Sequence, residues 1–376
     1  MTEYKICNRC IMDTSDPDII FDENGICNHC TNAINNLNKY PFTLNTTEKE
    51  KKLNEIIAKI KKNGKNKKYD CIIGISGGVD STYLAYLTKK WGLNPLAIHL
   101  DNGWNSELAV QNIHKTLKEL NIDLYTVVLD WEEFKNIQLS FLKASVPDLE
   151  IPTDHAILAT LFNIAEKYNI KYILNGSNYR TESILPRTWS NGHFDWGYIK
   201  YIKHKFGTTK IKKFPHINPW VMGYRYFLKN VSSINILNYI DYQKDKAIEI
   251  LEKELNWKNY KTKHGESTYT FFIQSYILPI KFNYDKRRAH LSSLICSGQI
   301  NREDALQKIK EPLYTLQEIN ELKKLVCDKL DITTDYFEEL MKLPNKTYFD
   351  FPNYENKPFY IISKKVYNVL KKLKYK

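Results

Sequence analysis

The stretch GISGGVDS follows an apolar run, YDCII, without a break. Gly77 and Gly78 allow the backbone to turn its N–H groups inward. Ser76 and Ser81 add hydroxyl donors at the point where a helix is expected to begin, with the positive end of its dipole. Inward N–H groups and a helix N-terminus both attract an anion, so the stretch predicts a phosphate site. The carboxylate of Asp80 would repel phosphate, so we expect it to hold Mg²⁺ or to order the loop.

The loop departs from the two commonest nucleotide-binding patterns. A Walker loop requires a lysine before its last serine or threonine, and a dinucleotide fingerprint requires G-x-G-x-x-G. Neither pattern can be read from Gly74 onward. A plain strand–turn–helix connection needs one glycine rather than this set, so a phosphate cradle is favoured over a simple turn.

Two C-x-x-C pairs stand near the N-terminus, Cys7 with Cys10 and Cys27 with Cys30. Four thiolates from two such knuckles can surround one tetrahedral Zn²⁺. An iron–sulfur cluster or a redox pair is the alternative, and His29 could replace a cysteine. The module is too small for a core of its own, so a structural zinc would supply its folding energy. The other three cysteines are isolated in the sequence.

The elements that must position these residues are strands alternating with helices. Strands are expected at 70–75, 95–100, 124–129 and 171–175, and helices at 46–62, 81–92, 106–120, 132–144 and 153–169. Short apolar runs between helices predict an α/β fold with a doubly wound parallel sheet, whose strands end at one ligand-binding edge. The pattern divides the chain into a zinc-knuckle module (1–38), the sheet domain (46–230) and a mainly helical region (231–376).

The composition indicates which partners and which cell compartment to expect for this protein. Lysine and arginine exceed aspartate and glutamate by 55 − 43 = 12, which fits a polyanionic partner or simply a lysine-rich solvated surface. The sequence shows neither a long apolar run nor a secretory signal, so we expect a cytoplasmic protein without a membrane span.

One segment after the sheet domain, residues 263–306, is dense in charged side chains. His264 and Glu266 form a candidate proton-transfer pair within KHGES. Four cations could neutralise phosphates or an acidic acceptor: Lys281, Lys286, Arg287 and Arg288. The other interpretation is that DKRR is a solvated helix start and HGES a loop.

SGGVDS resembles the pyrophosphate loop of the N-type ATP pyrophosphatases (PP-loop superfamily), which release AMP and pyrophosphate from ATP. The resemblance implies ATP and Mg²⁺. The implied nucleotide-contacting residues are the loop itself and residues near two further strand ends: Gly74, Ser76, Gly77, Gly78, Asp80, Ser81, Asp101, Asn102 and Gly176, with Lys286.

A larger set of motifs, the CxxC pairs, ISGGVDS, IPTDHAI, NGSNYRTESILP, KHGES and KFNYDKRRAHLSSLICSGQ, resembles the N-acetyl sugar amidotransferase family over nearly the whole chain. That resemblance implies conversion of an acetamido group to an acetamidino group in bacterial O-antigen or flagellar glycan biosynthesis. Asp80, His264, Glu266, Lys281 and Arg287 would be the catalytic residues. Acceptor contacts are then expected from residues near the strand ends and from one basic residue: Asp154, His155, Asn178, Glu182 and Arg288. Asp154 reads equally well as a helix N-cap.

The sequence lacks both common glutaminase nucleophile patterns, so ammonia is expected from a separate subunit. The family resemblance implies a glutaminase like that of histidine biosynthesis, with a cyclase-like subunit, while a homo-oligomer is left open. The expected acceptor is a free or nucleotide-linked sugar, with neither a membrane nor a nucleic acid as partner. One alternative is a PP-loop tRNA sulfur transferase. Another is a non-enzymatic nucleotide-binding protein whose knuckles recruit partners.

Overall fold

The computed structural model describes residues 3–260, 265–358 and 360–361. A five-stranded sheet runs in the order β3-β2-β1-β4-β5 with every pairing parallel. Its strands are β1 (Cys71–Gly74), β2 (Pro95–Asp101), β3 (Asp123–Val128), β4 (Tyr172–Leu174) and β5 (Ser232–Ile234). The predicted α/β fold with a parallel sheet is confirmed. The order changes direction between β1 and β4, and such a switch point is where open parallel sheets bind ligands.

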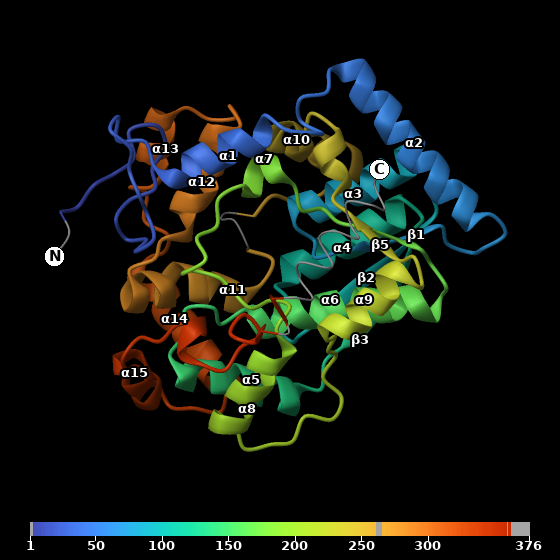
Figure 1. The fold of residues 1–376 in the computed structure, drawn as a ribbon. Helices are drawn as coiled ribbons and strands as arrows, with labels where there is room; N and C mark the ends of the chain where they lie inside the picture. Colours follow the sequence, from blue (N-terminus) through green and yellow to red (C-terminus); the bar gives the residue numbers. More distant parts are fainter. Residues whose placement is uncertain (1–2, 261–264, 359, 362–376) are drawn as a thin grey trace.

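Helices cover both faces of the sheet and build the rest of the molecule (Figure 1). Up to β4 they are α1 (Asn28–Leu37), α2 (Thr46–Gly64), α3 (Val79–Lys90), α4 (Glu107–Glu119), α5 (Trp131–Ala144) and α6 (Ile151–Lys167). Between β4 and residue 260 they are α7 (Tyr179–Glu182), α8 (Trp196–Phe206), α9 (Pro219–Phe227), the 3₁₀ turn η1 (Ile236–Tyr239) and α10 (Lys244–Leu255). From residue 265 they are α11 (Thr268–Phe272), the π-helix η2 (Ile273–Phe282), α12 (Lys286–Cys296), α13 (Arg302–Lys308), α14 (Leu316–Lys329), α15 (Thr334–Lys342) and the 3₁₀ turn η3 (Tyr348–Asp350).

The central strand β1 is buried on both faces. Ile73 packs into a cluster formed with α2, α3 and α4, while its neighbour Ile72 packs into a second cluster with α6. Successive side chains of a strand point to opposite faces, so an unbroken apolar run such as CII needs a helix layer on each side. This burial explains why the apolar runs predicted the strands within a residue or two.

The sheet extends past the predicted domain boundary at residue 230. β5 pairs with β4 through three residues, and α10 packs on α3. The strand SSI has two serines among its three residues, so its sequence carries no apolar run to predict it. The sheet domain therefore continues to about the end of α10, at Leu255.

A second core lies away from the sheet, among α5, α8, α11, α14 and α15. It buries large aromatic side chains, including Trp104, Phe141, Tyr198 and Phe272. The mainly helical C-terminal region predicted from the sequence is thus confirmed. Within the described ranges, no helix is long and apolar enough to cross a bilayer.

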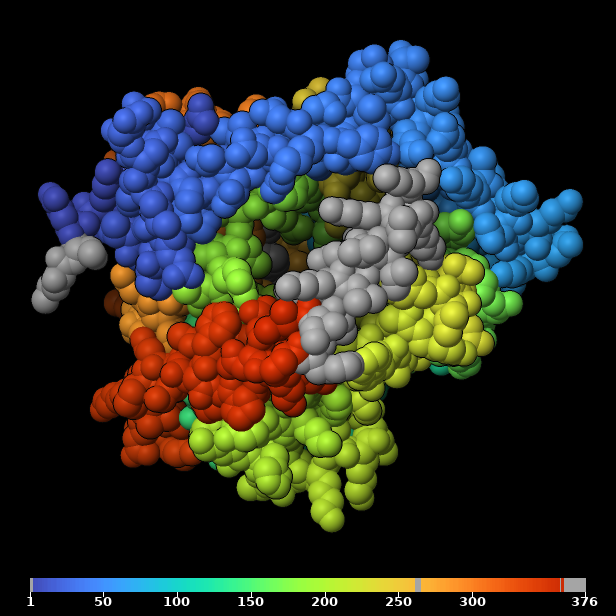
Figure 2. All heavy atoms as spheres, viewed as in Figure 1, coloured from blue at the N-terminus to red at the C-terminus, as the bar shows by residue number. Residues whose placement is uncertain are grey.

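The N-terminal module lies against α12 and α13, at one side of the molecule (Figure 1). In Figure 2, the N-terminal residues (blue) border one side of a hollow and the last described residues (red) border the opposite side.

Candidate active site and metal centre

The glycine loop joins β1 to α3 with the geometry of an anion cradle. Gly77 has φ +84°, and a Cβ added there would lie 2.8 Å from the carbonyl oxygen of Ala109, so only glycine fits. Gly78 is the N-cap of α3 and has no side chain to cap the helix, which leaves the first N–H groups for a ligand. The hydroxyls of Ser76 and Ser81 lie 3.1 Å apart at the same place. The loop therefore offers backbone and hydroxyl donors together, as a pyrophosphate requires.

Two aromatic side chains hold the loop in this shape. Trp257 Nε1 and the Tyr260 hydroxyl each donate to the carbonyl oxygen of Gly77, both at 2.9 Å. Burial raises the pKa of Tyr260 to about 12, and the nearby charge of Glu266 acts in the same direction. The phenol therefore stays protonated as a donor at neutral pH. Neither residue is predicted from the sequence, because both lie about 180 positions after the loop and belong to no motif.

Asp80, in the first turn of α3, is oriented by a buried phenol. The hydroxyl of Tyr242 donates to its Oδ1, and Tyr242 is 1% exposed. Burial raises the pKa of Tyr242 strongly, and the charges of Asp80 and Glu182 add to the effect. The carboxylate is thus fixed beside the loop, where it can hold Mg²⁺ against phosphate oxygens.

The end of β4 packs directly on this first turn. A Cβ at Gly176 would lie 3.0 Å from the backbone nitrogen of Ser81. Asn178 follows as the N-cap of α7, 2% exposed, and accepts from Thr181 N at 3.0 Å. Glu182, at the end of α7, is close enough to Tyr242 for its charge to raise that pKa. Gly176 and Glu182 thus lie near the Asp80–Tyr242 pair, and Asn178 caps the short helix between them.

In the turn after β2, the predicted residues Asp101 and Asn102 form hydrogen bonds within the turn itself. Asp101 accepts from Gly103 N at 2.9 Å and from Asn105 Nδ2 at 3.2 Å. Asn102 is buried and accepts from Trp104 N at 3.1 Å. Both side chains shape the turn at the carboxyl edge of the sheet, and their predicted contact with ATP remains a prediction.

Glu266 is brought to the loop from the C-terminal region. Its carbonyl accepts from Ser106 N at 2.9 Å, and Thr268 N donates to Trp104 O at 2.9 Å, so this segment runs beside the turn after β2. A Cβ at Gly78 would lie 3.2 Å from Glu266 Oε1, which places the carboxylate against the cradle. His264, its predicted partner, lies outside the described residues.

The four cations of the C-terminal segment lie in different places. Lys281 Nζ donates to the carbonyls of Leu340, Met341 and Leu343 at 3.2, 2.9 and 2.7 Å, at the end of α15. Each of these contacts is structural, and none of them reaches the glycine loop. Lys286 Nζ lies 3.6 Å from the carboxylate of Glu150.

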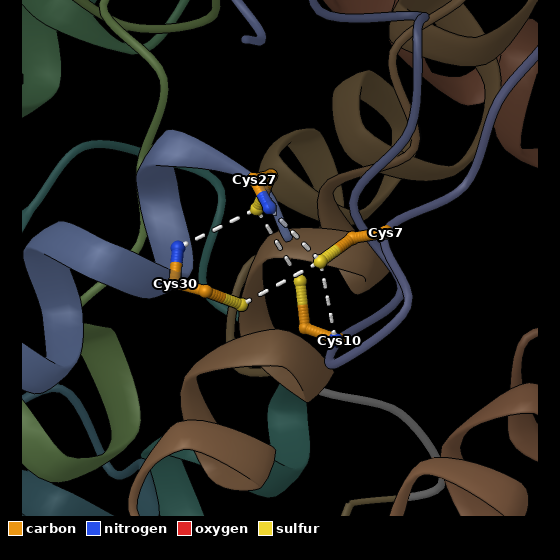
Figure 3. Close-up of side chains that lie close together, drawn as sticks. All are labelled: Cys7, Cys10, Cys27 and Cys30. Carbon is orange, nitrogen blue, oxygen red and sulfur yellow. Dashed lines mark hydrogen bonds between the residues drawn. The ribbon is translucent and has the colours of Figure 1, made fainter. Parts of the chain in front are cut away.

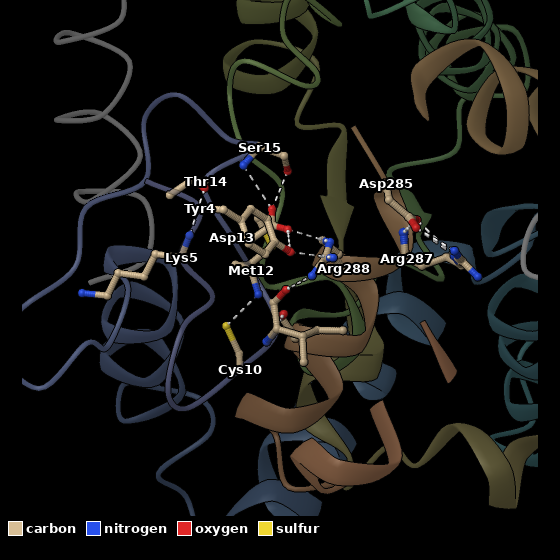
Figure 4. Close-up of polar contacts among 12 residues, drawn as sticks. Tyr4, Lys5, Cys10, Met12, Asp13, Thr14, Ser15, Asp285, Arg287 and Arg288 are labelled. Carbon is tan, nitrogen blue, oxygen red and sulfur yellow. Dashed lines mark hydrogen bonds and ion pairs between the residues drawn. The ribbon is translucent and has the colours of Figure 1, made fainter. Parts of the chain in front are cut away.

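Arg287 and Arg288 point in different directions from the start of α12 (Figure 4). Arg287 pairs with Asp285, with Nη2 2.7 Å from Oδ2, and donates to the Glu311 carbonyl at 2.7 Å. Arg288 pairs with Asp13 of the N-terminal module at 3.0 Å and donates to the Ile11 carbonyl at 2.9 Å. Arg288 therefore contacts the N-terminal module, whereas the family resemblance implies a contact with the acceptor sugar.

Around the start of α6, a charged cluster forms that the sequence predicted only in part. Asp154 lies 3.4 Å from Nε2 of His193, a residue that carried no motif. Burial lowers the pKa of His193, but the hydrogen bond that its ring donates to Asp154 and the charge of Asp148 outweigh this effect and raise the pKa to about 9. The structure thus pairs Asp154 with a protonated imidazole rather than using it as the N-cap, which is Glu150.

His155 lies behind this pair and is fully buried. Its Nδ1 bonds the carbonyl of His193 at 2.9 Å, and its Nε2 accepts from Ile217 N at 3.2 Å. Burial lowers the pKa of His155 to about 4, so the ring is neutral. Both ring nitrogens form hydrogen bonds with backbone groups. His155 therefore positions the loop that carries His193.

The four N-terminal cysteines converge on one point (Figure 3). All four are fully buried, and their sulfur atoms lie within 4.8 Å of one another. The Cys7–Cys30 and Cys10–Cys27 sulfur distances are 3.8 and 3.7 Å. A tetrahedral site with Zn–S bonds of about 2.3 Å places its sulfurs roughly 3.8 Å apart, so these residues fit zinc.

Neighbouring groups support the same site. Cys27 N points at Cys7 Sγ at 3.2 Å and Met12 N at Cys10 Sγ at 3.4 Å, contacts that suit thiolates. His29, an alternative ligand by sequence, instead bonds Asp16 at 2.6 Å. Cys296, isolated in the sequence, lies 3.8 Å from Cys30 in space, next to the predicted ligand set.

Two family models match separate parts of the chain. Residues 49–149, which include the glycine loop, match the NAD synthase family. Residues 266–371 match the C-terminal domain of LPS biosynthesis proteins similar to WbpG.

Individual relatives are distant. The chain is 22% identical over 326 residues to the uncharacterized protein MJ1599 of Methanocaldococcus jannaschii, covering 85% of this chain and 98% of that protein. It is 30% identical over 112 residues to the tRNA-specific 2-thiouridylase MnmA 2 of Fusobacterium nucleatum, covering 28% of this chain and 32% of the relative. This chain thus spans about a third of the thiouridylase.

Solved structures with similarity include the NMN synthetase from Francisella tularensis, at 15% identity and TM-score 0.34, covering 81% of this chain and 98% of that one. The NH3-dependent NAD synthetase from Campylobacter jejuni shows 17% identity and TM-score 0.33, covering 70% and 97%. The NAD synthase match over a glycine loop of this geometry supports placing the chain in the PP-loop ATP pyrophosphatase superfamily.

Proposed function

We propose that this protein is an ATP-dependent amidotransferase that converts the acetamido group of an N-acetyl sugar to an acetamidino group. The amide oxygen attacks the α-phosphate of ATP, which forms an O-adenylyl imidate and releases pyrophosphate. Ammonia then adds to the imidate carbon, AMP leaves with the former amide oxygen, and a proton is lost. An amide oxygen is a poor leaving group, so its adenylylation is the step that requires ATP.

One observation carries this proposal: a pyrophosphate-type loop and a WbpG-like C-terminal domain occur on the same chain. The first indicates AMP-forming activation, and NAD synthase, whose family matches that part, gives the precedent for an ATP-using carbon–nitrogen ligase. The second belongs to proteins described as acting in LPS biosynthesis, which supports a bacterial surface sugar as the acceptor.

The residues around the loop suit the first step. The hydroxyls of Ser76 and Ser81 and the N–H groups of α3 would bind the departing pyrophosphate. Asp80, held by Tyr242, would keep Mg²⁺ on the phosphates. Glu266 lies against Gly78 and is positioned to orient the acceptor or the incoming nitrogen. The four-cysteine centre lies in a different module and would hold a structural zinc.

The test combines purified protein, ATP, Mg²⁺, ammonium chloride and a panel of free and nucleotide-linked N-acetyl sugars. We expect AMP and pyrophosphate in equal amounts and, with the right sugar, a product in which NH replaces one oxygen by mass. ADP in place of AMP would exclude this chemistry. A glutaminase subunit is the proposed ammonia source, so glutamine alone should support turnover only after that subunit is added.

A tRNA sulfur transferase is the second candidate, because the aligned segment is 30% identical to the tRNA-specific 2-thiouridylase. Several such enzymes carry a further cysteine pair, whereas Cys296 here lies beside the four-cysteine centre and Cys327 is buried in the helical core. Release of AMP that depends on added tRNA, with loss of a thiolated nucleoside on gene deletion, would favour this candidate over the sugar.

A further inference from the structure

A fifth sulfur atom lies against the four-cysteine centre. Cys296 is the last residue of α12 and is half-buried, whereas the four predicted ligands are fully buried. Its Sγ lies 3.8 Å from Cys30 Sγ, which is also the separation of Cys7 Sγ and Cys30 Sγ within the centre. Four thiolates complete a tetrahedral zinc site, so Cys296 is not needed as a ligand.

Three of the four predicted ligand sulfurs accept hydrogen bonds from backbone N–H groups. Cys7 Sγ accepts from Cys10 N at 3.5 Å and from Cys27 N at 3.2 Å (Figure 3). Cys10 Sγ accepts from Met12 N at 3.4 Å, and Cys27 Sγ accepts from Cys30 N at 3.4 Å. Four thiolates around one divalent ion leave an excess of negative charge, and such donors stabilise it.

The sulfur of Cys30 differs from the other three. Within the part of the chain that the structure describes, no backbone N–H group donates to it, and the Cys296 thiol lies where such a donor is missing. Metal-bound cysteines have lost their protons. Cys296 is therefore the member of this pair that keeps an S–H group, and a thiol is a weak hydrogen-bond donor.

The C-terminal region also contacts the first knuckle, formed by Cys7 and Cys10. Arg302 donates to the carbonyl oxygens of these two residues at 3.0 and 3.1 Å. The backbone N–H group that follows Cys10 donates to Ser292 Oγ at 3.2 Å. Cys296 comes four residues after Ser292, on the same face of α12. One helix thus contacts both knuckles, which couples the metal centre to the C-terminal region.

We propose that Cys296 is a positioning residue of the metal centre, whose thiol donates a hydrogen bond to the metal-bound thiolate of Cys30. Without this donor, the charge on the Cys30 sulfur is less well stabilised and the centre holds its ion more weakly. Removal of a group that hydrogen-bonds to a metal ligand typically lowers metal affinity about 10–100-fold. The inference concerns the metal centre and does not depend on the proposed sugar chemistry.

Competition of the full-length protein with a zinc chelator of known affinity tests the donor. Cys296→Ala should weaken zinc binding about tenfold. Cys296→Ser keeps a hydroxyl donor in nearly the same place and should retain most of the wild-type affinity. A packing role predicts the opposite order, because Cys296 packs in an apolar cluster, where alanine is tolerated better than serine.

Cys327 provides the matched control. It is 1% exposed in the helical core, away from the metal centre. Cys327→Ala and Cys327→Ser should therefore leave the affinity for zinc unchanged, although serine should lower the Tm more than alanine because it buries a hydroxyl.

Cobalt(II) in place of zinc provides a readout of the thiolates themselves. The wild type and both Cys296 variants should show the visible bands of a tetrahedral four-sulfur site, because the ligand set is unchanged. The sulfur-to-cobalt charge-transfer band should move to longer wavelength in Cys296→Ala, because a thiolate that has lost its hydrogen-bond donor releases an electron more readily. In Cys296→Ser the band should return toward its wild-type position.

Three results would overturn the proposal. The first is equal zinc affinity in the wild type and Cys296→Ala, and the second is a serine variant that binds zinc no better than the alanine variant. The third is loss of the four-sulfur cobalt bands in Cys296→Ala, which would make Cys296 a ligand. A wild-type protein that binds neither ion would remove the centre and this proposal together. The proposed function would stand, since AMP and pyrophosphate release test it separately.

Discussion

The buried hydroxyl of Tyr242 donates a hydrogen bond to Oδ1 of Asp80, across 162 positions of the chain. This contact fixes the one carboxylate of the glycine loop at the switch point of the sheet. It makes Tyr242, which has no motif, a positioning residue for the predicted Mg²⁺ site.

Tyr242→Phe should lower kcat about tenfold or more, because a hydrogen bond to a charged group contributes about 1.5–3 kcal/mol. The measurement is pyrophosphate release at saturating ATP. Tyr83→Phe is the control, since Tyr83 packs against Tyr242 with ring centroids 5.8 Å apart but does not bond Asp80. Equal losses in both variants would indicate a packing effect instead.

Asp80→Asn should abolish turnover while keeping the fold, because the amide retains the shape and an acceptor for Tyr242 but cannot balance Mg²⁺. Unfolding curves and pyrophosphate release together check this. If Asp80 acts through its orientation, the double variant with Tyr242→Phe should lose little more activity than Asp80→Asn alone. Wild-type turnover in Asp80→Asn would remove this residue from the site.

Gly77→Ala should destabilise the loop and abolish ATP-dependent activity. Its φ of +84° costs a side chain about 1–2 kcal/mol, and the added Cβ would meet the Ala109 carbonyl at 2.8 Å. Gly223→Ala, in α9, is the control because an added Cβ there meets nothing within 4 Å. It should be neutral or stabilise the protein by about 0.5–1 kcal/mol in urea unfolding.

The His193 pair predicts a pH dependence of stability. The pKa of His193 rises from 6.5 to about 9, so the protonated ring stabilises the fold fully below pH 6.5 and loses this contribution as the pH rises through 9. The shift corresponds to at most about 3 kcal/mol, less because the side chain is partly exposed. His193→Gln should flatten the unfolding free energy between pH 6 and 10. His204→Gln, exposed on α8, should leave the slope unchanged.

The four-cysteine centre predicts about one zinc per chain by elemental analysis. Cys30→Ser should lose the metal and lower the Tm, since the module docks on α12 and α13 through Arg288 and Arg302. Cys327→Ala, in the separate helical core, should keep the metal. Iron in place of zinc would contradict the assignment.

The sequence by itself determined the parts that depend on local pattern. The alternation of apolar runs with helices predicted four parallel strands, because strands such as CII are buried on both faces. The glycine loop and the paired cysteines were also readable, since each is contiguous and demands particular residue types. Gly77 could be recognised from the adjacent sequence alone, because the backbone conformation of the loop at this position admits no side chain.

The tertiary structure decided everything that depends on residues far apart in the chain. Trp257 and Tyr260 hold the loop and Tyr242 orients Asp80, although none of these three lies in a motif, and Cys296 lies beside Cys30 although the two are far apart in the sequence. The tertiary structure also decided the roles of the charged residues. In the sequence, an arginine or a histidine is equally compatible with a contact to the acceptor sugar and with a structural contact. Arg288 contacts the N-terminal module and His155 is buried, whereas His193 pairs with Asp154. Which group a charged side chain contacts depends on tertiary packing. That packing forms only when the helices of the C-terminal region pack against the sheet domain.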